Sequence, residues 1–237
     1  MKAVILAGGK GARLAPYTRI LPKPMMPIGD KAILEILLSQ MKYYGVDEVI
    51  LTVGHLAGLM RAFFQDGSAL GLKISYCYEE QPLGTAGPLA RIEGLTETFL
   101  VANGDVLTTL DISDLIRFHH AQKDAMITIA THERKVNIDL GVIETNGDHT
   151  VKGYIEKPKL DYLVSMGLYV FDPATLAYIP KDEYLDFPDL VRKLIAAGKK
   201  VSAYPFDGYW QDIGRQDDYE QANNDFALMR SQFLPEG

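Results

Sequence analysis

Residues 1–31, MKAVILAGGKGARLAPYTRILPKPMMPIGDK, decide how the rest of the chain is interpreted. The apolar run over residues 3–6 predicts a buried strand, which leads directly into Gly8, Gly9 and Gly11. Glycine has no Cβ, so its backbone can come close to a ligand. Successive free N–H groups in such a loop form a concavity that binds anions. The stretch therefore predicts a strand followed by an anion-binding loop.

Two cations follow these glycines. Arg13 lies within the same turn, and Lys23 stands between Pro22 and Pro24, which stiffen the backbone around it. A guanidinium fork, a point charge and free amides together suit a polyphosphate. A turn whose glycines serve only packing would leave Arg13 and Lys23 unexplained.

Two other glycine-rich loops fit this stretch less well. A P-loop requires G-x-x-x-x-G-K-[ST], and Arg13 occupies the place of its second glycine when the motif starts at Gly8. The dinucleotide fingerprint G-x-G-x-x-G can start at Gly9, but Leu14 replaces its third glycine. The prolines that follow also prevent a helix from opening there.

The bulk composition describes an ordinary α/β domain. The chain has 237 residues, of which 47% are hydrophobic and 23% are charged, enough for a full core. A formal net charge of −7 argues against a nucleic-acid partner. The single Cys77 excludes an intrachain disulfide and fits a reducing compartment. No apolar run has the length of a membrane span and no signal-peptide pattern opens the sequence, so we expect a cytoplasmic protein without a membrane partner.

The first half of the chain alternates strand and helix patterns. Strands are expected at residues 3–6, 49–53, 72–78 and 98–102, and helices at residues 33–41 and 56–64. This order implies a parallel sheet with right-handed crossovers. The carboxyl ends of parallel strands share one edge, so the loops that follow them should face one another.

The second half adds shorter strands and three helices. Asn146-Gly147 between two strand-like runs predicts an antiparallel hairpin. The expected strands are residues 125–131, 140–144, 150–156, 165–171 and, as the last strand, 201–204; the expected helices are 176–179, 187–197 and about 217–232. The final helix is amphipathic and should pack on the domain or on a second subunit.

Another helix is expected to begin after Asp111, its N-cap, and to end near Ala121. His119 and His120 lie in this helix and point in different directions. They lack the i,i+4 spacing of a zinc pair, so we expect both at the surface.

Two aspartates are candidates for a metal site. Asp105 follows a predicted buried strand in Asn103-Gly104-Asp105, and Asp212 stands in the apolar frame of residues 208–214. Mg²⁺ takes one or two protein carboxylates and completes its shell with phosphate oxygens and water. A carboxylate in apolar surroundings is costly unless it is paired or ligating.

These stretches together resemble the sugar-1-phosphate nucleotidylyltransferases. Seven stretches match that family in order: LAGGKGARL, PKPM, EQPLGTAG, NGD, EKP, GLYVF and WQDIG. The resemblance implies an α/β fold with a Rossmann-like, mostly parallel central sheet, helices on both faces and a small antiparallel sugar-binding lobe. It divides the single domain into a nucleotide-binding core (1–131), a sugar-binding lobe with completion of the sheet (132–214) and a C-terminal helix (215–237).

The resemblance also implies an activity: an NTP and a sugar 1-phosphate react to give an NDP-sugar and pyrophosphate. Arg13 and Lys23 would be catalytic, and Asp105 and Asp212 would bind Mg²⁺. The implied nucleotide-binding residues are Leu6, Ala7, Gly8, Gly9, Gly11, Arg13, Gln81, Gly84, Thr85 and Asn103. The implied sugar-phosphate-binding residues are Lys23, Asp105, Gly141, Glu156 and Lys157.

The base and the sugar remain open at this level. GTAGPL and GYWQDIGR look most like the mannose-1-phosphate guanylyltransferase-like branch, which favours GTP with mannose 1-phosphate or a related sugar. Uridylyl, thymidylyl and cytidylyl transfer are the alternatives. Ser165-Met166 replaces the Asn-Ala that this family usually has, at the place where the sugar would be recognised.

Two other classes of function stay open, as does a homo-oligomeric state. A metal-dependent glycosyltransferase usually needs D-x-D, which Asp105-Val106-Leu107 lacks. A non-catalytic subunit that senses nucleotide sugars would not require Arg13 and Lys23 to be present together with both aspartates.

Overall fold

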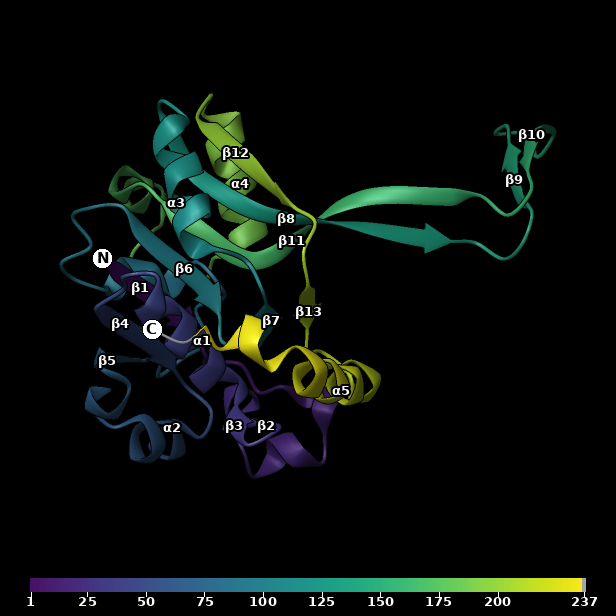
Figure 1. Cartoon of the computed structure of the whole chain (residues 1–237). Helices are drawn as coiled ribbons and strands as arrows, with labels where there is room; N and C mark the ends of the chain where they lie inside the picture. Colours follow the sequence, from purple (N-terminus) through teal and green to yellow (C-terminus); the bar gives the residue numbers. More distant parts are fainter. Residues whose placement is uncertain (236–237) are drawn as a thin grey trace.

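A computed structural model of the chain describes residues 1–235. Its centre is a seven-stranded sheet in the order β12-β8-β11-β6-β1-β4-β5 (Figure 1). The strands are β1 (Lys2–Leu6), β4 (Glu48–Val53), β5 (Lys73–Tyr78), β6 (Phe99–Asn103), β8 (Ala125–Asn137), β11 (Lys159–Phe171) and β12 (Lys200–Phe206).

The sheet is mostly parallel, as predicted. β1 pairs in parallel with β4 and with β6, β4 with β5, and β8 with β12. Only β11 runs against its neighbours, and it pairs antiparallel with β6 and β8. The first half of the chain therefore builds one side of the sheet, and β11 joins it to the second half.

Helices cover both faces of the sheet, because successive side chains of its strands point to opposite faces. In β1, Ala3 and Ile5 pack in one core cluster with Leu34 and Leu37 of α1. Val4 lies in another cluster on the opposite face, together with residues of α4. The helices are α1 (Ile33–Tyr43), α2 (Ala57–Phe64), α3 (Ile112–Ala121), α4 (Phe187–Ala196) and α5 (Gln216–Phe233).

The C-terminal helix α5 packs on the body of its own chain. Ala222 and Phe226 are buried beside Ile33 and Ile36 of α1, in a third cluster that also contains Ile28. A Cβ at Gly29 would lie 2.9 Å from the Phe226 ring, so only glycine allows this approach. The predicted amphipathic face is thus confirmed as an intrachain contact.

For α3, the predicted N-cap Asp111 is confirmed, but the predicted surface position of His119 is wrong. Asp111 caps α3 by accepting hydrogen bonds from the amides of Ser113 and Asp114. His120 is exposed, but His119 is only 4% exposed and its Nδ1 lies 2.8 Å from the hydroxyl of Thr128. His119 is buried because it stands four positions after Leu115, on the face of α3 that covers the sheet.

The segment expected to be helical at residues 176–179 forms part of a 3-10 helix instead, η6 (Pro173–Tyr178), and a further 3-10 helix is η5 (Gly87–Arg91). The amides of Ala86 and Gly87 both donate to the carbonyl of Leu185, so a tertiary contact fixes the start of η5. Shorter 3-10 turns are η1 (Ala12–Leu14), η2 (Tyr17–Arg19), η3 (Lys23–Met25) and η4 (Ser68–Leu70).

Three small two-stranded sheets surround the main sheet. The predicted hairpin is confirmed as β9 (Val142–Thr145) and β10 (Val151–Ile155). The others are β2 (Pro27–Ile28) with β3 (Lys31–Ala32), and β7 (Val106–Thr108) with β13 (Trp210–Asp212). β12 is therefore not the last strand, because β13 follows it and pairs with β7.

Strand β8 is longer than predicted and extends beyond the body. β8 and β11 each have 13 residues and stay paired from Thr131 and Ser165 to Asn137 and Lys159. Figure 1 shows them leaving the body as a ribbon that carries β9 and β10 at its far end. We call residues 133–163 the arm.

A search of residues 1–235 finds no helix with the length and hydropathy needed to cross a bilayer.

Candidate active site

The site lies at the carboxyl edge of the parallel strands. β1 has β4 on one side and β6 on the other, so the chain leaves β1 at the point where the strand order reverses. The amide of Gly104 donates to the carbonyl of Leu6 over 3.1 Å, and the amide of Ala7 donates to the carbonyl of Thr52 over 3.0 Å. The loops after the three strands therefore converge, as predicted.

The glycine-rich loop turns sharply at Gly11. Its φ of +60° is a left-handed conformation that favours glycine. Thr18 donates from its hydroxyl to the carbonyl of Gly11 over 2.9 Å, and a Cβ at Gly11 would lie 3.0 Å from the Thr18 methyl carbon. The 3-10 turn η1 follows and carries Arg13 on its exposed side.

Lys23 and Asp105 form an ion pair at the centre of this edge. The side chains are 12% and 20% exposed, so the pair is largely removed from water. The Nζ of Lys23 also lies 4.0 Å from Oδ1 of Asp212. One ammonium group thus faces both predicted metal-binding aspartates.

Strand pairing brings the two aspartates together. Asp212 is the last residue of β13 and pairs with Val106, which follows Asp105 in the chain. The amide of Ile213 also donates to the carbonyl of Asp105 over 3.4 Å. The Asp212 side chain is 49% exposed, more than its apolar frame suggested. Asp218 caps α5 by accepting from the amide of Arg215, so Asp212 does not serve that helix.

The electrostatics of Asp212 are those of a carboxylate facing another carboxylate. Partial burial raises its pKa above the ordinary value, and the nearby charge of Asp105 raises it further. Lys23 and Arg13 oppose this shift. The carboxylate of Asp212 is therefore easier to protonate than an ordinary aspartate, chiefly because it is partly buried.

A cavity of about 300 Å³ contains this centre. Its lining combines the glycine loop with both cations and one of the aspartates. The lining residues are Leu6, Ala7, Gly9, Gly11, Ala12, Arg13, Lys23, Pro24, Gly104, Asp105 and Gly214. A cavity with these amides and cations can hold phosphate groups. We call it the phosphate cavity.

A second cavity of about 810 Å³ adjoins the first and shares Leu6, Gly9 and Asp105 with it. We call it the base cavity. Its other lining residues are Gly8, Lys10, Thr52, Gly54, His55, Glu79, Glu80, Pro82, Gly84, Thr85, Asn103, Tyr184 and Asp186. The two cavities together form one continuous cleft along the edge of the sheet.

Glu79 is a partly buried carboxylate in the lining of the base cavity. A Cβ at Gly8 would lie 2.6 Å from its Oε1, and its Oε2 accepts a hydrogen bond from the amide of Leu83 over 3.4 Å. Burial is the main cause that raises the pKa of Glu79. The absence of a Cβ at Gly8 thus leaves room for the carboxylate of Glu79 in its present position.

The far wall of the base cavity is built by two distant segments. Asp186 accepts from the amide of Thr85 over 3.1 Å, and the hydroxyl of Thr85 accepts from the amide of Phe187 over 2.7 Å. Gly84 has a φ of +78°, and a Cβ there would lie 2.5 Å from the carbonyl oxygen of Leu185. The predicted loop is therefore locked to the segment before α4.

Most of the predicted site residues line this cleft, but five do not. Gln81 is exposed and lies outside both linings, although Glu80 and Pro82 on either side of it are lining residues. Asp212 also lies outside both linings, although its Oδ1 is 4.0 Å from the Nζ of the lining residue Lys23. The other three predicted residues outside both linings are Gly141, Glu156 and Lys157.

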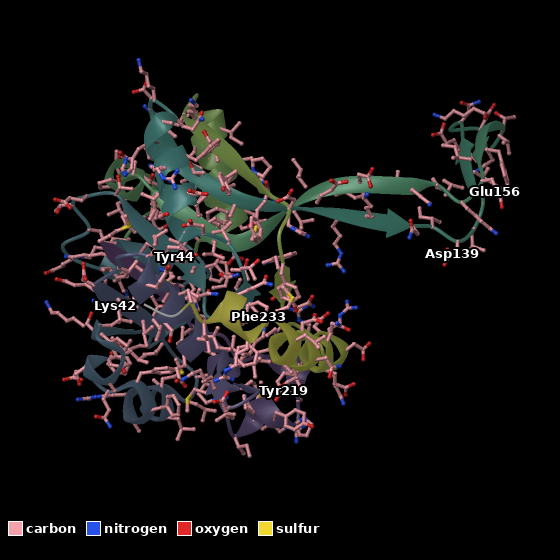
Figure 2. The ribbon with its side chains drawn as sticks, in the orientation of Figure 1. Lys42, Tyr44, Asp139, Glu156, Tyr219 and Phe233 are labelled. Atoms are coloured by element: carbon pink, nitrogen blue, oxygen red, sulfur yellow. The ribbon has the colours of Figure 1, made fainter. Side chains whose placement is uncertain are left out.

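These three residues belong to the arm. Glu156 and Lys157 follow the end of β10 in a turn rather than in a strand, and Lys157 has a φ of +45°. Both side chains are exposed, and Figure 2 shows Glu156 at the far end of the arm. The carboxylate of Glu156 accepts from the hydroxyl of Tyr154 over 2.9 Å. Their predicted role at the sugar phosphate remains a prediction.

The sequence did not indicate several lining residues. Gly54 and His55 follow β4 and lie at the same edge as the glycine loop, so the parallel-strand argument could have found them. Glu79 stands directly before the predicted loop. Tyr184 and Asp186 come from a segment without any motif, and no local pattern indicates that they reach the cleft.

Among residues 1–235, no group of three or more His, Cys, Asp or Glu side chains could hold a metal ion by itself. The paired carboxylates of Asp105 and Asp212 do fit Mg²⁺, which needs only one or two protein carboxylates when phosphate oxygens complete its shell. A bound cation would favour the ionised form of Asp212, whose pKa is raised chiefly by burial and further by the charge of Asp105.

Comparison with known protein families decides the relationship. Residues 2–228 match the family described as Nucleotidyl transferase. The chain belongs to this family. The match spans both cavities, the arm and most of α5, so the resemblance seen in seven short stretches holds for the chain as a whole.

Two relatives are similar to this chain over nearly its whole length. A UTP–glucose-1-phosphate uridylyltransferase from Synechocystis is 35% identical over 242 residues, covering 94% of this chain and 62% of the relative. A mannose-1-phosphate guanylyltransferase from Mycobacterium tuberculosis is 35% identical over 232 residues, covering 95% of this chain and 64% of the relative. This chain thus spans less than two thirds of the length of these relatives.

Solved structures agree on the fold. A Bacillus anthracis protein with a provisional assignment as a glucose-1-phosphate thymidylyltransferase has a TM-score of 0.77 at 23% identity, with 98% of both chains covered. HddC from Yersinia pseudotuberculosis in complex with GMP-PN has a TM-score of 0.69 at 26% identity, covering 95% of this chain and 99% of HddC. The expected α/β fold of the family is confirmed.

Proposed function

We propose that this chain transfers a nucleotidyl group from an NTP to a sugar 1-phosphate and releases pyrophosphate. One observation carries the proposal: two adjoining cavities at the strand edge combine a glycine loop, two cations and an aspartate pair with a larger pocket lined by carboxylates. An NTP would place its phosphates in the phosphate cavity and its base in the base cavity. The relatives named above are nucleotidylyltransferases, which supports the same reaction.

The reaction needs positioning and charge neutralisation more than proton transfer. A phosphate oxygen of the sugar 1-phosphate attacks the α-phosphorus of the NTP, and the bond to the leaving pyrophosphate breaks. The nucleophile is already an anion, so no general base is required. The difficulty is to hold two anions in line, and fixed cations reduce that difficulty.

The cations of the phosphate cavity have distinct tasks. Lys23 is fixed by its ion pair with Asp105 and by the prolines around it, so its ammonium can contact the α-phosphate and the incoming phosphate together. Arg13 lies on the exposed side of η1, beside Gly214, where its planar fork can follow the departing pyrophosphate. The amides of the glycine loop would hold the remaining phosphate oxygens.

We propose Mg²⁺ as the cofactor, held by Asp105 and Asp212. When bound, the ion would neutralise phosphate charge and act as a Lewis acid. The ammonium of Lys23 would stay beside Asp105 and would face the substrates from that position. The two aspartates come from β6–β7 and from β13, so pairing of β7 with β13 sets their separation.

We propose GTP as the nucleotide and mannose 1-phosphate, or a related sugar 1-phosphate, as the acceptor. The edge of guanine presents adjacent N1–H and N2–H donors, which a carboxylate accepts in a bidentate manner. Glu79 and Glu80 place carboxylates in the base cavity. A pyrimidine presents only one ring N–H or an amino group, so it cannot donate to a carboxylate in this bidentate manner. Uridylyl, thymidylyl and cytidylyl transfer are therefore the alternatives that the test compares with guanylyl transfer.

We also propose that Gly141, Glu156 and Lys157 bind the sugar phosphate. A lysine ammonium suits a phosphate, and a glutamate carboxylate accepts hydrogen bonds from sugar hydroxyls. For this assignment to hold, the far end of the arm, which carries these residues, must reach the cleft formed by the two cavities. The proposed substrates are small soluble molecules, and the proposed setting is the cytoplasm.

Release of pyrophosphate tests the reaction class. The purified chain is incubated with Mg²⁺ and each of four NTPs against a set of sugar 1-phosphates. Pyrophosphate should form with GTP and a manno-configured sugar 1-phosphate, and Lys23→Ala should abolish it. Release of NDP from a nucleotide sugar would instead indicate a glycosyltransferase. Nucleotide binding without either product would indicate a sensing subunit and would overturn the proposal.

A further inference from the structure

The arm is rich in exposed apolar side chains. Across residues 1–235, nineteen large hydrophobic side chains are exposed, and nine of them lie between residues 136 and 163. They are Val136, Leu140, Ile143, Val151, Tyr154, Ile155, Leu160, Tyr162 and Leu163. Apolar side chains gathered on one protruding element indicate an interaction surface.

The two strands of the arm divide this surface into two faces. Directly opposite residues of an antiparallel pair share a face. Val136 pairs with Leu160 and Arg134 pairs with Tyr162, so these side chains form one mainly apolar face. The other face carries the pairs of Lys135 with Asp161, Glu133 with Leu163 and Asn137 with Lys159, which are mostly charged. An amphipathic ribbon is built to lie on another surface.

The arm does not gain that cover from its own body. A two-stranded ribbon alone is at best marginally stable in water. Figure 1 shows the arm projecting from the sheet, with β9 and β10 well clear of every helix. A second surface is therefore needed to cover Val136, Leu160 and Tyr162.

The arm cannot turn back onto its own cleft without losing its pairing. β8 and β11 stay in register from Thr131 and Ser165 to Asn137 and Lys159. β8 is also held by β12 up to the pair of His132 with Phe206. The interruption in register lies between Ser165 and Tyr169, inside the body, so it gives the arm no hinge at its base.

The cleft has fewer cations than carboxylates. Its charged lining residues together with Asp212 are Lys10, Arg13, Lys23, Glu79, Glu80, Asp105, Asp186 and Asp212. Three cations face five carboxylates, and Lys23 is already paired. The substrates that we propose are polyanions, so a further cation at the mouth of the cleft would favour their binding.

We propose that two copies of this chain exchange arms, so that the arm of each copy lies on the body of the other and brings Lys157 and Glu156 to its cleft. The sugar-phosphate part of this proposal rests on the proposed function, whereas the arm exchange does not. The apolar face of each arm is covered by the other body, and its tip supplies the missing cation. A two-fold axis makes both exchanges equivalent, so both clefts become complete.

The oligomeric state is the first test. Light scattering of the intact chain should give the mass of a dimer. Leu160→Asp combined with Tyr162→Asp places charges on the apolar face and should give a monomer that keeps its native circular dichroism. Leu228→Asp is the matched control, because Leu228 is 84% exposed on α5 and should leave the dimer intact. A monomeric wild-type chain would overturn the proposal.

Mixed dimers test whether the arm acts on the other copy. Lys23→Ala removes a cleft residue and Lys157→Ala removes an arm residue, and each variant alone should be inactive. After the variants exchange subunits, a mixed dimer contains one intact cleft served by an intact arm. Pyrophosphate release should therefore return to roughly a quarter of the wild-type rate, since about half of the dimers are mixed and each has one working site.

The same experiment has clear negative results. No recovery in mixed dimers, confirmed as mixed by mass, would mean that each arm serves its own cleft. Full activity of Lys157→Ala would mean that the arm supplies no required cation. Either result overturns the proposal.

A readout independent of activity separates this proposal from the proposed function. A photoreactive amino acid replaces Glu156 in an isotope-labelled copy, which is mixed with an unlabelled copy of the native sequence. Crosslinks should join the labelled arm to unlabelled peptides of the glycine loop or β13. Crosslinks with an inactive wild-type chain would refute the proposed reaction and keep the arm exchange. Crosslinks confined to labelled peptides would refute the exchange.

Discussion

Lys23 and Asp105, which are 82 residues apart in the sequence, form an ion pair at the carboxyl edge of the sheet. Lys23 comes from the stiff turn η3, and Asp105 comes from the loop between β6 and β7. The same ammonium lies 4.0 Å from a carboxylate oxygen of Asp212. A single ammonium group therefore faces two carboxylates at the place where phosphates would bind.

Replacing Lys23 with alanine should lower kcat/KM by roughly 100-fold or more, the usual cost of losing one group that stabilises transition-state charge. Lys23→Arg should restore little, because the side chain is only 12% exposed and a guanidinium needs more room than an ammonium. Steady-state pyrophosphate release gives both values. Lys31→Ala is the control, since Lys31 pairs with Glu35 within its own segment and should keep full activity.

Asp212→Asn should weaken Mg²⁺ binding yet stabilise the metal-free protein. The folded-state pKa of Asp212 is raised, so its ionised form costs stability, and this cost grows as pH rises from 3.8 through the folded-state pKa. The gain at neutral pH should be less than about 1 kcal/mol, because the side chain is half exposed. The Mg²⁺ concentration that gives half-maximal activity should rise about 10-fold or more.

Thermal unfolding with EDTA at pH 7 and at pH 4 checks the stability part of this prediction. The variant should melt above the wild type at pH 7, and the difference should shrink at pH 4. Asp217→Asn at the exposed start of α5 is the control and should show no gain. Equal melting temperatures of Asp212→Asn and wild type at both pH values would argue against repulsion between the aspartates.

Sequence reasoning predicts the fold where burial has a strong pattern. The strands of the first half are continuous apolar runs, and their order implies the shared edge where the cleft lies. The arm was harder to predict, because both its faces are exposed and charged residues interrupt Val136, Leu160 and Tyr162. Such a ribbon has the local composition of a loop. Its strand structure depends on pairing between segments that lie far apart in the sequence.

Some residues of the candidate site could likewise be predicted from the sequence, and others could not. Arg13, Lys23, Asp105 and the glycine loop could be predicted, because loops after parallel strands meet at one edge. Asp186 could not, since it reaches the cleft only through its hydrogen bonds with Thr85. A motif states which residue types occur together, but it does not give their distance in space. His119 could have been predicted as buried, because its spacing from Leu115 matches the buried face of α3.

Glu79→Gln should reduce the preference for GTP over UTP. A carboxylate accepts both guanine donors, whereas the amide of glutamine opposes one of them with its own N–H groups. A bidentate contact of this kind contributes about 1–3 kcal/mol to base discrimination, so the ratio of kcat/KM values should fall roughly 10-fold or more. Glu93→Gln, on an exposed position outside both cavities, is the control. An unchanged ratio would remove Glu79 from base recognition.

Gly84→Ala should destabilise the fold and raise KM for the nucleotide. Alanine is strained at a φ of +78°, and its Cβ would lie 2.5 Å from the carbonyl oxygen of Leu185. The expected cost is about 1–3 kcal/mol. Gly198→Ala is a matched control, since Gly198 has a φ of +67° and open space around its Cβ position, so it measures the conformational cost alone. Urea unfolding of both variants should show a larger loss for Gly84→Ala.

Burial of His119 should make stability depend on pH below neutrality. Loss of hydration is the main cause that lowers the pKa of His119 in the folded protein, and the charge of His120 adds to it. The unfolded chain therefore binds more protons between the folded-state pKa and 6.5. Stability should be fully present above 6.5 and should fall as pH decreases through that window.

Urea unfolding between pH 5 and pH 7.5 measures this slope. His119→Asn retains a polar partner for Thr128 but cannot titrate, so its stability should change less over the same range. His120→Asn, at the exposed neighbouring position, should keep the wild-type slope. Wild-type and His119→Asn curves with the same slope would mean that the imidazolium is accommodated in the fold, and that the contact with Thr128 does not require a neutral ring.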